Sequence, residues 1–249
     1  MLAVVGTRNA TDYGRRMCDN VLSELSGIDM GVVSGLAYSI DTYAHRMSLD
    51  YSIPTYAVLG SGFDNVYPAS NIPLAEEISD VGCLITEFTH DTKPDRDNFP
   101  RRNRIIAGLS DAVLVVEAAQ KGGALITADM AISYDREVFA VPGRATDKYS
   151  EGCNNIIKNN KAYCVTSAND IIVNMNWDCE QSVKMQKIPT LNLEGRQREI
   201  YSLLSQKDRN IDDMATALNM SVATLSVELM EMEINGIVEF KPGKLYGVK

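Results

Sequence analysis

The stretch Leu2-Ala-Val-Val-Gly-Thr-Arg8 sets the pattern that most of the chain repeats. A short apolar run leads directly into a small-residue turn, and a segment with helical spacing begins after Thr11. Such runs are typical of buried parallel strands, and threonine is a common helix N-cap. The stretch therefore predicts a strand, a tight turn and a helix from Tyr13 to Leu25.

The same alternation continues downstream. An amphipathic segment from Leu74 to Ile78, for example, is preceded by Asn71 and Pro73, which are typical of a helix start. Further buried strands are predicted at Gly31 to Val33, Thr55 to Leu59, Cys83 to Ile85, Ala112 to Val116 and Val138 to Val141. Alternating strands and helices predict an α/β fold, namely an extended Rossmann-like, doubly wound, mostly parallel sheet.

A different pattern follows Trp177. Residues 178–189 are polar and lack periodicity, so we interpret them as a linker between a Rossmann-like domain (residues 1–177) and a second domain (residues 190–249). Three helical segments and a β-like tail predict a small C-terminal winged-helix domain. These segments are Gly195 to Leu204, Ile211 to Leu218, Ser221 to Gly236, and the tail Ile237 to Phe240 with Leu245 to Val248.

Composition narrows the function classes. The formal net charge of −9 over 249 residues disfavours nonspecific coating of nucleic acid, so any such site must be a local basic patch. The sequence has no apolar run long enough for a membrane helix and no charged leader, so we expect a cytoplasmic protein without membrane contact.

Metal and cofactor chemistry is not expected either. The five cysteines are odd in number and never spaced C-x-x-C, and the only histidines, His45 and His90, have no metal-ligand spacing. The pair Gly60-Ser-Gly62 lacks a third glycine at position 65, which is Asn, so NAD binding is not expected. His45 has no nucleophile at helical spacing and is interpreted as a packed or capping histidine.

Three small-residue turns can present backbone N–H groups and a helix N-terminus to an anion, because each follows a predicted strand. They are Gly6-Thr7-Arg8, Ser34-Gly35 and Lys121-Gly122-Gly123, the last followed by Thr127 on the same helix. Turns at adjacent strand ends form one crevice in an open α/β sheet.

The strongest charge feature is Phe99-Pro-Arg-Arg-Asn-Arg-Ile-Ile-Ala-Gly-Leu109, in which Arg101, Arg102 and Arg104 open a helix beside Asn103. Cations at a helix N-terminus oppose its dipole unless they have a partner. In the alternative interpretation, these arginines form ion pairs with the nearby acids Asp95 and Asp97 and have no role in binding. We favour phosphate, which guanidinium groups bind through paired hydrogen bonds, and Phe99 can stack on a base or anchor the loop.

Several motifs in one order resemble the DNA-processing protein A family (DprA/Smf) over about residues 2–173. They are Gly6-Thr-Arg8, Val33-Ser-Gly-Leu-Ala37, Ile40-Asp41, Ala44-His45, Val58-Leu-Gly60, Tyr67-Pro68 with Asn71, Phe99-Pro100, Arg102 to Leu109, Val115-Val-Glu-Ala118, Leu125-Ile-Thr127, Val138 to Gly143, and Gly152-Cys-Asn154.

The resemblance implies a protein without catalytic activity that binds single-stranded DNA in a positively charged pocket, forms a homodimer, and protects incoming DNA and loads RecA recombinase during natural transformation. The pocket would be lined by Gly6, Thr7, Arg8, Ser34, Gly35, Arg102, Arg104, the Gly122-Gly123 turn and Thr127. No cofactor is implied.

The chain departs from the family pattern at three places. Tyr38-Ser39 stands where a glycine usually precedes the Ile-Asp pair, so a side chain there is expected to narrow the pocket. The loop around Ala69 lacks a basic residue that some members carry. Many members have a helical domain ahead of the first strand, so a truncated or shorter form is expected.

Two other functions remain open. Glu117 near the glycine turn suggests a nucleotide-binding enzyme of the phosphoribohydrolase type, and the winged helix suggests a transcription regulator. Residues 190–249 carry seven Lys/Arg against nine Asp/Glu, and the expected recognition helix holds Glu228, Glu231 and Glu233 without a basic residue. Groove reading normally requires basic or amide donors, so we favour a protein-contact role for this domain.

Overall fold

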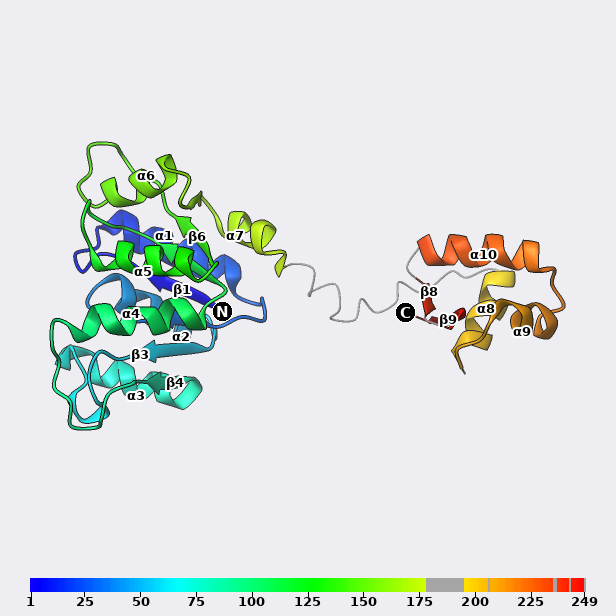
Figure 1. Cartoon of the computed structure of the whole chain (residues 1–249), viewed down its shortest axis with the longest axis horizontal. Coiled ribbons are helices and arrows are strands. Elements are labelled where there is room, and N and C mark those ends of the chain that lie inside the picture. Colours follow the sequence, from blue (N-terminus) through cyan, green and yellow to red (C-terminus); the bar gives the residue numbers. More distant parts are fainter. Residues whose placement is uncertain (178–194, 206, 235–236, 242, 249) are drawn as a thin grey trace. The chain divides into compact units, whose positions relative to one another are not determined.

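The structure is a computed structural model, and it describes residues 1–177, 195–205, 207–234, 237–241 and 243–248. The predicted linker at residues 178–189 lies outside the described residues. The chain divides into two compact units, residues 1–184 and 185–249, which Figure 1 shows and which are treated separately below.

The first unit contains a parallel sheet in the order β4-β3-β2-β1-β5-β6-β7. Its strands are β1 (Leu2–Val5), β2 (Val32–Ser34), β3 (Thr55–Val58), β4 (Cys83–Ile85), β5 (Ala112–Val115), β6 (Glu137–Ala140) and β7 (Tyr163–Cys164). The predicted Rossmann-like sheet is confirmed, with strand ends shifted by one residue or less. The edge strand β7 escaped prediction because its two residues are exposed and form no apolar run.

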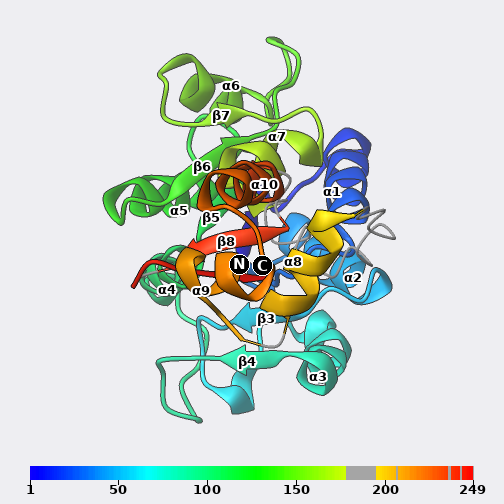
Figure 2. The same ribbon diagram turned by 90° about the vertical axis from the view of Figure 1, so that its right-hand side faces the viewer.

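Helices cover both faces of this sheet. On one face lie α1 (Asp12–Leu25), α2 (Ile40–Asp50), α3 (Ile72–Val81) and α7 (Ala168–Met175), and on the other lie α4 (Asn98–Leu109), α5 (Gly123–Ser133) and α6 (Glu151–Lys158). In Figure 2, α4 and α5 stand on one side of the strands, and α1 and α3 stand on the other. Two short 3-10 turns, η1 (Phe63–Asn65) and η2 (Ala69–Asn71), lie between β3 and α3.

Side-chain alternation along the strands explains why both faces are buried. Leu2 and Val4 pack with α1, α2 and α7, whereas Ala3 and Val5 pack with α4, α5 and α6. Thr11 caps α1 as predicted, because its side chain accepts a hydrogen bond from the Gly14 N–H. Since all seven strands are parallel, the loops after them gather at one edge, the carboxyl edge of the sheet.

The second unit confirms the predicted winged helix. It consists of α8 (Arg196–Leu204), α9 (Ile211–Ala217), α10 (Val222–Ile234) and the antiparallel pair β8 (Val238–Lys241) and β9 (Leu245–Val248). This unit has its own apolar core around Ile200, Met214, Leu225 and Leu229. Among the residues described in both units, no helix is long and apolar enough to cross a membrane.

Candidate nucleic-acid interface

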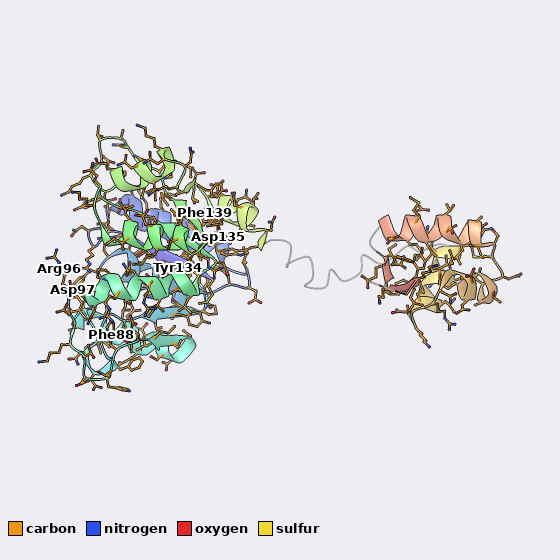
Figure 3. The ribbon with its side chains drawn as sticks, in the orientation of Figure 1. Phe88, Arg96, Asp97, Tyr134, Asp135 and Phe139 are labelled. Atoms are coloured by element: carbon orange, nitrogen blue, oxygen red, sulfur yellow. The ribbon has the colours of Figure 1, made fainter. Side chains whose placement is uncertain are left out.

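The three predicted anion turns lie together at the carboxyl edge. Residues 6–8 follow β1, Ser34-Gly35 ends β2, and residues 121–123 follow β5. β1 lies between β2 and β5, so the strand order changes direction there, which is where open α/β sheets bind ligands. Figure 3 shows Arg96 and Asp97 at this edge and Tyr134 and Asp135 toward the other end of the sheet.

The first turns of α4 contact the loops that follow several different strands. The Phe99 ring lies under the Arg8 guanidinium, 5.4 Å from ring centroid to Cζ, and the Arg101 Cζ lies 5.7 Å from the centroid of Phe88. Asn103 donates to the Gly123 carbonyl at 3.4 Å. This helix start therefore connects the loops after β1 and β4 with the start of α5, and Arg102 reaches the ends of β2 and β3.

Arg102 points into the protein, with only 3% of its surface exposed. Its Nη1 donates to the Gly35 carbonyl at 2.6 Å and to the Val58 carbonyl, and its Nε donates to Asn103 Oδ1 at 3.2 Å. Burial lowers the pKa of this guanidinium to about 10, so it stays charged at neutral pH. Arg102 holds the ends of β2 and β3 in place.

Asp41 supports the same loop from the other side. Its carboxylate accepts the Gly35 N–H at 3.2 Å and the Ala37 N–H at 3.4 Å. Burial raises the pKa of Asp41, while the positive charge of Arg102 and the two backbone donors oppose that shift. Beneath the exposed turns there is thus a buried network of polar groups that includes Asp41 and Arg102.

The loop that carries Arg8 is anchored on both sides of this residue. Thr7 N–H donates to the Glu117 carbonyl at 2.7 Å, and Ala10 N–H donates to Ser39 Oγ at 2.7 Å. Thr11 donates to the Glu117 carboxylate through its N–H at 2.9 Å and its hydroxyl at 2.6 Å. Arg8 itself is exposed, so a rigid loop presents its guanidinium to solvent.

Ser39 stands where family members usually have a glycine before the Ile-Asp pair. Its backbone has φ 73° and ψ −108°, a conformation that favours glycine, and its hydroxyl accepts the Ala10 N–H. The Ser39 side chain therefore links the β2–α2 loop to the Arg8 loop.

The turn before α5 is open. Lys121, Gly122 and Gly123 are exposed, and a Cβ built on either glycine would meet no atom within 4 Å. Thr127 is buried, and its hydroxyl donates to the Gly123 carbonyl at 3.2 Å. A ligand can therefore approach the backbone of this turn.

The structure separates the predicted site residues into three groups by exposure. Arg8, Arg101, Arg104 and the turn at residues 121–123 are exposed, Gly6 and Thr7 are half-buried, and the others are buried: Ser34, Gly35, Arg102, Asn103 and Thr127. Ser34 donates its hydroxyl to the Val4 carbonyl at 2.6 Å. Arg104 pairs with Glu87, rather than with Asp95 or Asp97.

Three further residues lie at this edge that the sequence analysis did not assign as site residues. Arg96 is exposed just before α4, and Tyr38 and Tyr67 are 45% and 40% exposed. Tyr38 was noted only as part of a departure from the family pattern and Tyr67 only as part of a motif, because each stands in an irregular loop without periodicity. Only the fold brings these side chains to the edge that carries Arg8.

Two residues considered for catalysis have structural partners. His45 is fully buried, with Nδ1 2.7 Å from Thr55 Oγ1, and burial lowers its pKa to about 3, so it is neutral. Both oxygens of Glu117 accept hydrogen bonds from Thr11 at the start of α1. Within the described ranges, no group of three His, Cys, Asp or Glu is placed to hold a metal ion.

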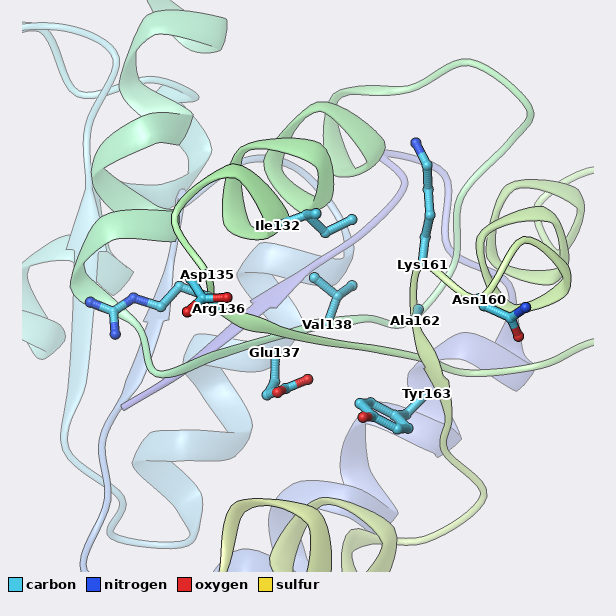
Figure 4. Close-up of a pocket in the computed structure, with 9 residues that line it drawn as sticks. All are labelled: Ile132, Asp135, Arg136, Glu137, Val138, Asn160, Lys161, Ala162 and Tyr163. Atoms are coloured by element: carbon cyan, nitrogen blue, oxygen red, sulfur yellow. The ribbon is translucent and has the colours of Figure 1, made fainter.

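A pocket of about 450 Å³ lies at the opposite edge, at the amino ends of β6 and β7 (Figure 4). Figure 4 shows Arg136 extending from it, with Asp135 beside it, and Lys161 on the loop before β7. None of the predicted site residues lines it, so it is separate from the carboxyl-edge site.

Two protein-family models match this chain. The model of the family described as DNA recombination-mediator protein A matches residues 1–176, and that of the DprA winged helix domain matches residues 187–244. Protein Smf of Synechocystis is 34% identical over 98% of this chain and 69% of its own length. DNA processing protein DprA of Bacillus subtilis is 41% identical over 68% of this chain and 57% of its own length.

Two solved structures resemble the first unit. DNA processing protein A of Streptococcus pneumoniae aligns with a TM-score of 0.65 and 38% identity, covering 69% of this chain and 60% of that one. DNA processing protein A of Helicobacter pylori, whose structure is described in terms of its single-stranded DNA binding mode, aligns with a TM-score of 0.65 and 28% identity, covering 71% and 80%. The chain spans 57% to 69% of the length of the first three curated relatives it matches.

Proposed function

The chain belongs to the DNA recombination-mediator protein A family, and from this premise we propose that its carboxyl edge binds single-stranded DNA. The observation that carries the proposal is the placement of Arg8 over Phe99, with the open turn at residues 121–123 at the same edge. A guanidinium beside an aromatic ring suits a phosphate next to an unpaired base. The relative from Helicobacter pylori is described as binding single-stranded DNA.

The exposed basic side chains provide the phosphate contacts. Arg8, Arg101, Arg104 and Lys121 reach solvent from three elements, whereas the chain as a whole has a formal charge of −9. Electrostatic attraction of DNA phosphates is therefore confined to this edge of the sheet. Arg102 acts by holding the loops, so the phosphate contacts belong to its neighbours on α4.

Family membership supports a proposal for the wider role. We propose that the protein protects incoming single-stranded DNA in the cytoplasm during natural transformation, forms a homodimer and loads RecA recombinase. It performs these tasks without catalysis. The support is the similarity to DNA processing proteins of Bacillus subtilis and Streptococcus pneumoniae.

The phosphoribohydrolase alternative needs a free acid near the glycine turn. Glu117 is 2% exposed, and its carboxylate is engaged by Thr11, so it is poorly placed to act on a nucleotide. Incubation with nucleoside monophosphates, followed by assay for free base, tests this alternative. Release of base well above background would favour it.

The decisive experiment is a fluorescence-anisotropy titration of labelled oligo-dT and of a matching duplex at two salt concentrations. Arg8→Gln and Arg104→Gln remove exposed cations, and Arg136→Gln is the matched control at the opposite edge (Figure 4). We expect tighter binding to the single strand, and a slope of log affinity against log salt that falls by about 0.7 for each phosphate that the variant no longer neutralises. Equal binding by wild type and both site variants would reject the proposed site.

A further inference from the structure

Three aromatic side chains, two from different loops and one from the first turn of α4, form a connected cluster at the carboxyl edge. The ring centroids of Tyr38 and Tyr67 lie 6.1 Å apart at an interplanar angle of 83°, and those of Tyr67 and Phe99 lie 5.6 Å apart at 48°. Tyr38 stands in the loop between β2 and α2, and Tyr67 stands between η1 and η2. The cluster ends at Phe99, beneath the guanidinium of Arg8.

This cluster is not explained by packing in the core. Tyr38 is 45% exposed and Tyr67 is 40% exposed, and neither belongs to an apolar core cluster of the described residues. Exposed tyrosines are ordinary, and Tyr134 is equally exposed at 45%. However, Tyr134 contacts no other ring among the described residues. Tyr38 contacts Tyr67, and Tyr67 contacts the Phe99 ring that lies under Arg8.

We propose that Tyr38 and Tyr67 form a stacking subsite for unpaired bases of a DNA strand whose phosphate lies at Arg8. This inference rests on the proposed function. The rings are inclined to one another, so adjacent bases that stack on them would have to splay apart. A single strand can do so, but a duplex cannot without losing its own stacking and pairing.

The subsite gives the site its preference for single strands. Phosphates are present in single and double strands alike, so arginine contacts alone discriminate weakly. Base faces are accessible only in the unpaired strand. Because every base has a π-face, stacking on tyrosine leaves the binding largely independent of sequence.

An oligonucleotide with abasic sites separates the two kinds of contact, since it keeps its phosphates and has no bases to stack. The variants are Tyr38→Leu and Tyr67→Leu, which keep an apolar side chain against the neighbouring ring but remove the aromatic face. Tyr67→Phe restores the ring without the hydroxyl. Tyr134→Leu is the matched control at the other end of the sheet (Figure 3).

We expect each leucine variant to bind oligo-dT about 5- to 150-fold more weakly than wild type. The same variants should bind the abasic strand like wild type, with an unchanged salt slope for both strands. Tyr67→Phe and Tyr134→Leu should retain wild-type affinity. Unchanged thermal unfolding midpoints would show that the variants are folded.

Two results would overturn the inference while leaving the proposed function intact. One is unchanged affinity of the leucine variants for oligo-dT. The other is an equal loss of affinity for the abasic strand, which would mean that the tyrosines act on the phosphate site. Failure of the wild type to bind either strand would instead reject the proposed function together with the subsite.

Discussion

Asp41 and Arg102 form hydrogen bonds with the two backbone polar groups of the same residue, Gly35. Asp41 accepts the Gly35 N–H at 3.2 Å, and Arg102 donates to the Gly35 carbonyl at 2.6 Å. A Cβ on Gly35 would lie 2.6 Å from the Arg102 guanidinium nitrogens, so a larger residue at this position would have to displace the Arg102 side chain. Two buried ionisable side chains therefore fix the loop beneath the candidate site, each through a different backbone group of Gly35.

Arg102→Ala should destabilise the fold strongly. The variant leaves the Asp41 carboxylate buried without its counter-charge and removes the donors to Gly35 and Val58, which predicts a loss of about 3 to 5 kcal/mol. Arg101→Ala removes a neighbouring exposed arginine and should change stability by about 0.5 kcal/mol or less. Urea unfolding of the two variants provides the comparison, and similar stabilities would show that Arg102 has no structural role.

Substitutions of Ser39 should separate backbone strain from the loop link. Ser39→Ala keeps the positive φ and loses the hydrogen bond to Ala10, whereas Ser39→Gly loses the bond but relieves the backbone. The glycine variant should therefore be more stable than the alanine variant by about 1 to 2 kcal/mol. Thermal unfolding measures the difference, and an alanine variant as stable as the glycine variant would contradict the strain.

Both Ser39 variants should also loosen the loop that carries Arg8, because neither can accept the hydrogen bond from Ala10. Faster hydrogen exchange at the Ala10 amide is the expected signature. If the amide exchanges at the wild-type rate in both variants, Ser39 does not restrain this loop.

The free energy of unfolding of the first unit should decrease as the pH falls, because His45 is buried in its neutral form. Its folded pKa of about 3 lies below the unfolded value of about 6.5, so the unfolded state takes up the proton first. Stability should therefore fall as pH decreases from about 6.5 toward 3, by roughly 1.4 kcal/mol per pH unit from this group.

The test compares wild type with His45→Gln, which removes this titration, and with His90→Gln at an exposed histidine. The stability difference between wild type and His45→Gln should shift by about 2 to 3 kcal/mol in favour of the variant between pH 6.5 and 4.5. Asp41 has a raised pKa, so its contribution to stability changes with pH in the opposite direction. Because wild type and His45→Gln both contain Asp41, that contribution largely cancels in the difference. A difference that stays constant with pH would show that His45 is not buried in its neutral form.

The winged helix should not bind duplex DNA by itself. Val227 and Met230 of α10 are 67% and 65% exposed, and the helix carries Glu228, Glu231 and Glu233 without a basic residue. Anisotropy titration of residues 185–249, which have their own core, should show no salt-sensitive binding to a duplex. Tight, sequence-specific binding by this unit would instead favour a transcription regulator.

The architecture could be predicted because its signals are local. The apolar run from Leu2 to Val5 and the N-cap at Thr11 are recognised from neighbouring residues, and the structure places both as predicted. The helix-turn-helix of the second unit is equally local, with Asn210 at the start of α9 and a short turn before α10. Strand β7 carries no such signal and was missed.

The sequence by itself determined the Rossmann-like sheet and the gathering of basic and glycine-rich turns at one edge, since apolar strand runs and their parallel order fix both. It also determined the winged helix, since three helical segments and a β-like tail follow one another in the second unit. Only the tertiary structure decided which arginine faces solvent. Successive residues on a helix point about 100° apart, so the burial of Arg102 between the exposed Arg101 and Arg104 depends on where β2 and β3 end beneath α4. The meeting of Tyr38, Tyr67 and Phe99 was likewise decided by the fold, because two loops and a helix start that are distant in the sequence come into contact only once the sheet has formed.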